Sequence, residues 1–76
     1  MSDGIPIISG NGAIKAFIKI GYIVVRQKGS HVRLLNDINS NRKPLTVPLH
    51  KELDKGLLRS LIRNAGISVE EFIKLL

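Results

Sequence analysis

The sequence predicts a two-layer α+β sandwich in which helices pack against a three-stranded antiparallel sheet. Apolar residues recur at helical spacing near the start of the chain and again over its last third. Between these segments lie three short runs of strand-forming residues, separated by polar segments that contain glycine and asparagine. Strands that follow one another without intervening helices indicate a segregated α+β order rather than alternating βαβ units. The expected order is helix, three-stranded meander, helix and short helix.

The first helix is expected to run for about nine residues from Ala13. Residues 1–8 form a lead-in before it, and a cluster of chain-breaking residues separates the two. Ser9 or Asn11 can cap the helix, since either side chain can accept a hydrogen bond from a free backbone N–H group. Gly21 is placed to end the helix.

The first two strands are expected to form a tight hairpin. The β-branched run at residues 22–26 is followed by a Lys-Gly pair, which indicates a turn. Residues 31–35 then alternate between polar and apolar side chains. Because successive side chains of a strand point to opposite faces, the apolar ones should face the core, and His31 and Arg33 the other side.

A third strand and two further helices complete the expected fold. Residues 45–49 form the strand, and Pro48, which cannot donate a hydrogen bond, marks a sheet edge or the strand's end. Apolar residues at helical spacing then continue to Ala65, with Asp54 placed to cap the helix and a glycine to end it. The last helix follows Ser68, which lies three residues before a glutamate in the pattern of a capping box.

The composition indicates one small basic domain, spanning residues 1–76. The net charge is +6 and the pI about 10.2, and most of the excess charge lies in residues 1–50. The absence of cysteine excludes disulfides and thiolate chemistry, and two histidines without clustered carboxylates disfavour a metal site. Because no apolar run is long enough to span a membrane and no signal-peptide pattern occurs, we expect a cytoplasmic protein without metal, cofactor or membrane partner.

The excess positive charge leaves several kinds of partner open. A basic face attracts nucleic acid, an anionic membrane or an acidic protein, and it can also serve only to keep a protein in solution. With one tyrosine, two phenylalanines and no tryptophan, a base-stacking platform for single strands is disfavoured. The acidic residues show no paired spacing, and no phosphate-binding glycine loop occurs, so the sequence supports neither two-carboxylate catalysis nor a nucleotide site.

His31 is the strongest candidate for chemistry. It follows the turn on the same face as Arg33, and Arg26 and Lys28 lie close to it in the hairpin. Histidine can take or give a proton near neutral pH, while the cations can hold a phosphate and stabilise transition-state charge. These groups suffice to cleave RNA without a metal, through attack of a 2′-hydroxyl on the adjacent phosphorus. On the residues alone, however, a histidine at the start of a strand is more often a solvated surface residue.

Two further groups of residues remain open. His50 follows the third strand, and without the loop geometry the strand register places it either near the hairpin or far from it. It can equally be a polar residue at a strand-to-helix junction. Lys55, Arg59 and Arg63 recur along one side of the predicted helix. They can bind RNA backbone or an acidic partner, or form a solvated helix face.

Four segments of the chain combine into a specific pattern. They are, in order, Gly21-Tyr22, residues 26–31 (RQKGSH), residues 46–50 (TVPLH) and residues 55–66 (KGLLRSLIRNAG). Each one alone is a weak signal, but together they resemble the HicA (YcfA-like) mRNA interferase toxins over nearly the whole chain. One departure is Leu57, where the family usually has threonine, so a hydroxyl near the helix start is missing.

The resemblance implies a double-stranded-RNA-binding-like α-β-β-β-α fold, in agreement with the element order above. It implies a type II toxin that cleaves mRNA independently of the ribosome and is neutralised by a HicB-type antitoxin, so mRNA and this antitoxin are the expected partners. The histidine of the Gly-Ser-His motif, His31, would be the catalytic residue. The candidate RNA-binding residues around it are Arg26, Lys28, Ser30 and Arg33. For His50, a phosphate contact, a structural role and catalysis all stay open.

Three functions are therefore weighed. The first is a metal-independent endoribonuclease toxin with His31 as general acid or base. The second is a non-catalytic RNA-binding module of the same fold. The presence of only one strong histidine candidate favours this alternative, because transesterification also needs an acid for the leaving 5′-oxygen. The third is a protein-interaction domain whose cations serve only an acidic partner.

Overall fold

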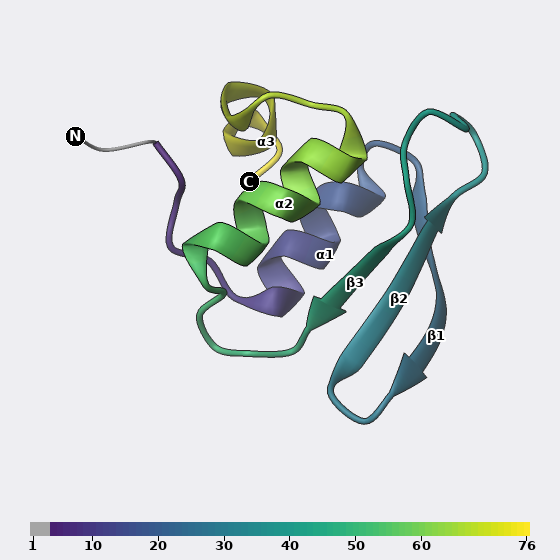
Figure 1. Ribbon diagram of the computed structural model, residues 1–76, viewed down its shortest axis with the longest axis horizontal. Coiled ribbons are helices and arrows are strands. Elements are labelled where there is room, and N and C mark those ends of the chain that lie inside the picture. The colour runs from purple at the N-terminus through teal and green to yellow at the C-terminus, as the bar shows by residue number, and fades with distance from the viewer. Residues whose placement is uncertain (1–3) are drawn as a thin grey trace.

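The computed structural model describes residues 4–76 and confirms the predicted order of elements (Figure 1). The elements are α1 (Gly10–Ile18), β1 (Tyr22–Lys28), β2 (His31–Asn36), β3 (Leu45–Pro48), α2 (Lys55–Ala65) and α3 (Val69–Lys74). The strands form one antiparallel sheet in the order β1-β2-β3, so β2 is central and β1 and β3 are edges. The fold is thus α+β, with the α-β-β-β-α order of a double-stranded-RNA-binding-like domain. The first three residues of the predicted lead-in and domain lie outside the described residues.

Helix α1 begins at Gly10 rather than at Ala13. Of the two candidate capping residues, Ser9 is the one that caps the helix. The Ser9 hydroxyl accepts a hydrogen bond from the backbone N–H of Gly12 at 3.0 Å. Glycines in the first turn lower helix propensity, which is why the apolar period alone places the start later. The strand bounds differ slightly as well, since β1 continues to Lys28 and β3 ends at Pro48.

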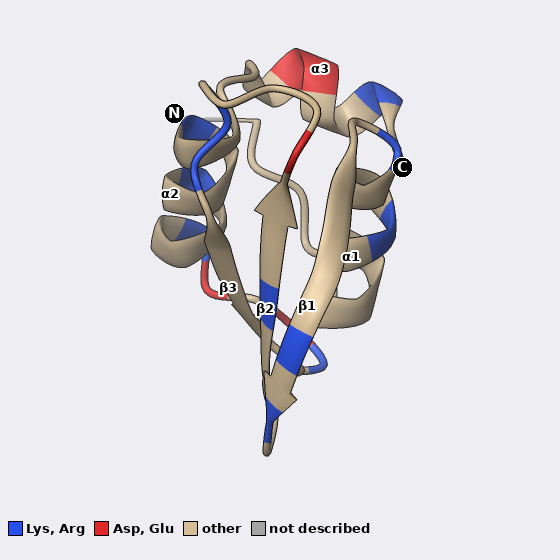
Figure 2. Cartoon of the chain, turned by 90° about the vertical axis from the view of Figure 1, so that its right-hand side faces the viewer, with Lys and Arg blue, Asp and Glu red and all other residues tan. Residues whose placement is uncertain are grey.

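Helices α1 and α2 cover one face of the sheet, and the core fills the space between the two layers (Figures 1 and 2). The three aromatic rings are the largest fully buried side chains among residues 4–76. Phe17 packs edge-on against Tyr22 with ring centroids 5.8 Å apart, and against Phe72 at 5.2 Å. Each ring is at most 1% exposed, so no aromatic side chain is available to stack on a base.

Both C-terminal helices begin as predicted, and α2 also ends at the predicted glycine, whereas α3 ends at Lys74, before the Leu76 to which it was expected to run. Asp54 caps α2 by accepting a hydrogen bond from Leu57 N–H at 3.2 Å, and Gly66 ends it in the left-handed conformation, with φ 75°. Ser68 and Glu71 form the capping box of α3. The hydrogen bonds that Glu71 shares with the Ser68 backbone and hydroxyl hold the pKa of Glu71 below its ordinary value of 4.5.

The predicted loop between β2 and β3 is held firmly to the rest of the fold. The Tyr22 hydroxyl donates to the Lys43 carbonyl at 2.7 Å, and burial raises the pKa of Tyr22 above its ordinary value of 10.0. Arg42 donates to the Ala65 carbonyl at 2.6 Å. Asn36 closes the other end of the loop through its bond to the Ile20 carbonyl at 2.9 Å. Over the described part of the chain, no helix has the length and apolar character that crossing a membrane requires.

Candidate functional site

The tight turn between β1 and β2 places His31 directly after it, as the first residue of β2. Lys28 and His31 are cross-strand partners, so the turn itself contains only Gly29 and Ser30. Gly29 has φ 59°, whereas Ser30 has no positive φ. Glycine at the first central position is the pattern of a type II′ turn, which matches the twist of the strands it joins. Gly29 therefore fixes the position of His31 opposite Lys28.

A β-bulge in β1 determines which face Arg26 occupies. Val24 pairs with Leu34, but Arg26 pairs with Arg33, so Val25 is an extra residue with no partner in β2. Without the bulge, Arg26 would lie on the same side as Val24 and the buried Leu34. The bulge shifts the alternation by one residue. It brings Arg26 onto the side of the sheet that Arg33 occupies.

Figure 2 shows Lys and Arg on the strands, and the pairing of β1 with β2 together with the alternation of β2 places the predicted site residues on the face of the sheet that no helix covers. Arg26, Lys28, His31 and Arg33 are all exposed, and the strands contain no carboxylate. The side chains of Arg26 and Lys28 make no hydrogen bond or ion pair within residues 4–76. We call the four residues the basic hairpin face. The pairing of β1 with β2 brings these four side chains near one another.

The cross-strand pair of Arg26 and Arg33 is electrostatically unfavourable in the isolated chain. Like charges directly opposite each other destabilise a sheet, by a few tenths to about 1 kcal/mol per pair. Of the two, within residues 4–76 only Arg33 has a polar partner, since it donates a hydrogen bond to the Thr46 hydroxyl at 3.0 Å. Two guanidinium groups held side by side without a carboxylate form a natural binding site for a phosphate.

Ser30 lies at the tip of the turn and is attached to the third strand through its backbone. Its carbonyl accepts a hydrogen bond from Leu49 N–H at 2.7 Å. The side chain is exposed, and the hydroxyl has no partner within residues 4–76. Ser30 is thus fixed in position while its hydroxyl is free to contact a ligand.

His50, which the sequence could not place, lies beside the hairpin turn. The β2–β3 ladder pairs His31 with Pro48, and the bond from Leu49 to Ser30 continues that pairing past the end of β3. The carbonyl of His50 accepts from Gly10 N–H at 2.9 Å, which ties it also to the start of α1. The sequence left this position open because it depends on packing between segments far apart in the chain.

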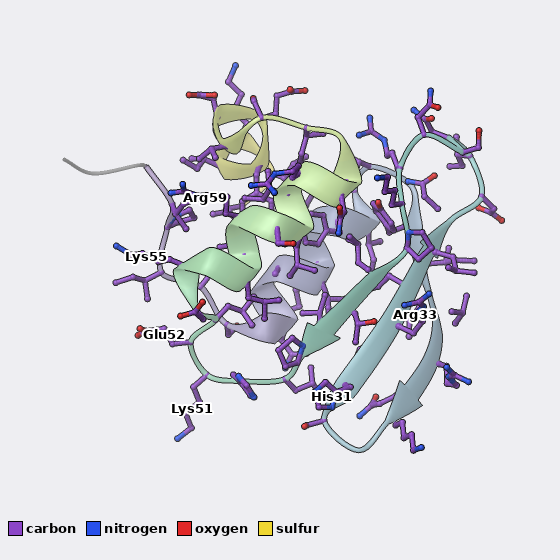
Figure 3. The ribbon with its side chains drawn as sticks, viewed as in Figure 1. His31, Arg33, Lys51, Glu52, Lys55 and Arg59 are labelled. Atoms are coloured by element: carbon purple, nitrogen blue, oxygen red, sulfur yellow. The ribbon has the colours of Figure 1, made fainter. Side chains whose placement is uncertain are left out.

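The cations of α2 form a separate group. Figure 3 shows Lys51, Lys55 and Arg59 along the outer side of α2 and the loop before it, away from Arg33 on the sheet. Glu52 lies in the same row, so this surface carries both signs of charge. Of the predicted helix cations, Lys55 and Arg59 are therefore not joined to the basic hairpin face.

The basic hairpin face can supply protons and positive charge. No group of three or more histidine or carboxylate side chains able to hold a metal ion occurs among residues 4–76. Although Leu57 lacks the hydroxyl that threonine would supply, the start of α2 is still capped, because Asp54 accepts a hydrogen bond there. An exposed imidazole flanked by three cations suits binding and proton transfer at a phosphate.

Comparison with protein families agrees with the pattern of these residues. A family model described as the HicA toxin of bacterial toxin–antitoxin systems matches residues 10–67. The match runs from the start of α1 past the end of α2, and so includes the sheet, the hairpin turn and His50. A search of curated proteins found no match.

Proposed function

Because the chain belongs to the HicA toxin family of bacterial toxin–antitoxin systems, we propose that this toxin is a metal-independent endoribonuclease that cleaves mRNA. His31 acts as general acid or base. Arg26, Lys28 and Arg33 bind the phosphate, and the Ser30 hydroxyl contacts the RNA beside them. The chain acts as one toxin domain in the cytoplasm, where mRNA is translated.

The observation that carries this proposal is the position of His31 on the basic hairpin face. His31 is the cross-strand partner of Lys28, and the neighbouring residue on the same face of β2 is Arg33, which pairs with Arg26. The strands contain no carboxylate. A phosphate bound there would relieve the repulsion between Arg26 and Arg33. An imidazole beside a bound phosphodiester is within reach of the 2′-hydroxyl that attacks it.

The proposed reaction is an internal transesterification. His31 removes the proton of the 2′-hydroxyl while that oxygen attacks the neighbouring phosphorus. Negative charge builds on the non-bridging oxygens of the pentavalent transition state, where the arginine and lysine side chains stabilise it. Water competes poorly for these cations once RNA covers the hairpin.

Two other functions use the same surface. A non-catalytic RNA-binding module would need the cations but not His31. A protein-interaction domain would need only an acidic partner. The side chains of Arg26 and Lys28, which have no partner within residues 4–76, support all three, whereas the exposed imidazole among them favours catalysis.

Incubation of a long mRNA with purified protein in EDTA separates these functions. We expect the wild type to cut the RNA and His31→Ala to bind it without cutting. The exposed Lys15→Gln variant on α1 controls for the loss of a charge elsewhere. Intact RNA that still shifts on a gel with the wild type would contradict catalysis and support a binding module. Neither cutting nor shifting would support the protein-interaction domain.

The family also implies an antitoxin, which we propose is of the HicB type and covers the basic hairpin face. Expression of the wild-type chain alone should arrest growth, and co-expression of the antitoxin encoded beside it should restore growth. His31→Ala, expressed at the same level, should not arrest growth. Normal growth with well-expressed wild-type protein would contradict the proposed mRNA cleavage.

A further inference from the structure

The position of His50 beside the hairpin turn suggests a role that the proposed mechanism leaves unfilled. We propose that His50 is the second proton-transfer residue, which protonates the leaving 5′-oxygen while His31 deprotonates the 2′-hydroxyl. This inference rests on the proposed ribonuclease function. It turns the single-histidine site into a paired acid–base site.

The first argument is that the main chain carries His50 to the same end of the sheet as His31. His31 pairs with Pro48, and the bond from Leu49 N–H to the Ser30 carbonyl, at 2.7 Å, extends this antiparallel pairing beyond β3. Leu49 packs against the core, whereas the next residue, His50, is exposed. The chain has two histidines in all, and both lie at this end of the sheet.

The second argument is that the backbone of His50 is held in place independently of its side chain. Its carbonyl accepts the hydrogen bond from Gly10 N–H at 2.9 Å. A Cβ on Gly10 would lie 2.0 Å from the Pro48 carbonyl oxygen, so only glycine permits so close an approach of α1 to this segment. The start of α1 thus holds the residues after β3 from one side, while the bond from Leu49 to Ser30 holds the same segment against the hairpin turn.

The third argument is that both imidazoles are exposed and bonded to no other group of residues 4–76. Within residues 4–76, neither His31 nor His50 makes a side-chain hydrogen bond or ion pair, and both are exposed. Two such imidazoles at one end of the sheet, next to the cations of the basic hairpin face, are available to a bound phosphodiester.

The chemistry requires two groups rather than one. In an in-line displacement the attacking and leaving oxygens lie on opposite sides of the phosphorus, so one imidazole cannot serve both at the same moment. As the bond from the 2′-oxygen to phosphorus forms, its proton passes to neutral His31. The bond from phosphorus to the 5′-oxygen breaks, and that oxygen takes the proton of the His50 imidazolium. The products are a 2′,3′-cyclic phosphate and a 5′-hydroxyl, and exchange with water restores both histidines.

A pair of RNA substrates tests the assignment. One contains the ordinary linkage, and the other has sulfur in place of the 5′-bridging oxygen at the same position. A thiolate leaves without being protonated, so the second substrate does not need the acid. We expect His50→Ala and His50→Gln to cleave the ordinary substrate about 10²- to 10⁴-fold more slowly than the wild type. On the sulfur substrate, both variants should recover to near the wild-type rate, whereas His31→Ala should stay slow on both.

Several results would overturn the inference. Wild-type rates of His50→Ala and His50→Gln on the ordinary substrate would show that no proton comes from this residue. Equal slowing on both substrates would assign it to binding or structure, and rescue of His31→Ala instead would reverse the two roles. Glu52→Gln, an exposed neighbour, serves as the matched control and should cleave at the wild-type rate. If the wild type cleaves neither substrate, the proposed ribonuclease function itself is contradicted.

Discussion

Removing one positive charge from the basic hairpin face should weaken RNA binding and also flatten its dependence on salt. Each phosphate contact releases counterions from the RNA, so the affinity falls with salt in proportion to the number of contacts. Arg26 and Lys28 have no partner within residues 4–76, and so are free to make such contacts. The variants to compare are Arg26→Gln and Lys28→Gln, each in a His31→Ala background that leaves the RNA intact.

The expected size follows from three cations, Arg26, Lys28 and Arg33. For a single strand each contact contributes about 0.7 to the slope of log affinity against log salt, so together they contribute about 2. Raising the salt from about 50 to 200 mM should then lower the affinity about 18-fold through these residues. Each single variant should reduce the slope by about 0.7, which lowers that ratio to about 7-fold.

Fluorescence anisotropy of a labelled RNA, titrated at several salt concentrations, measures both quantities. Lys15→Gln removes the same charge from α1, in the helical layer, and should leave the slope unchanged. A slope that stays the same in Arg26→Gln and Lys28→Gln would refute the assignment of these side chains as phosphate ligands. A loss of slope in Lys15→Gln equal to theirs would show that only the net charge matters.

Three predictions concern stability, each measured by urea unfolding. Gly10→Ala should destabilise the chain by at least about 1–3 kcal/mol, because its methyl group would overlap the carbonyl oxygen at the end of β3; wild-type stability would contradict that close approach. Tyr22→Phe should cost about 1–3 kcal/mol by leaving the Lys43 carbonyl without its donor, and no loss would mean that water replaces it. Because folding lowers the pKa of Glu71, this residue contributes its full stabilisation at pH values above its ordinary pKa of about 4.5. That stabilisation is lost as the pH falls below this value and through the lowered pKa of the folded state. Acidification should therefore cost the wild type more than Glu71→Gln, and equal losses would refute the role of the capping box.

The order of the elements could be predicted from the sequence because local signals decide it. The caps Ser9, Asp54 and Ser68 and the helix-ending Gly66 act through hydrogen bonds or dihedral angles within a few residues. The alternation of β2 also holds, since Val32 and Leu34 are buried while their neighbours are exposed. Such features depend little on the rest of the chain.

The details of the site could not be predicted in the same way. The unpaired Val25 looks like an ordinary member of a β-branched run, and only the pairing with β2 shows that it is extra. The place of His50 depends on the start of α1, some forty residues earlier, through the contact at Gly10. Both are tertiary features, in which the register is set by packing rather than by local propensity.

The bulge at Val25 has a second consequence, for how separate copies of the chain behave toward one another. β1 is an edge strand in which Ile23, Val24 and Val25 are 47%, 49% and 45% exposed. An exposed edge of this kind offers a template on which further strands can add, and strand addition leads to aggregation. An irregular edge is a poor template, because the bulge breaks the even row of N–H and C=O groups that a foreign strand would need. The same extra residue that turns Arg26 toward Arg33 therefore also protects a toxin released from its antitoxin against joining its own copies.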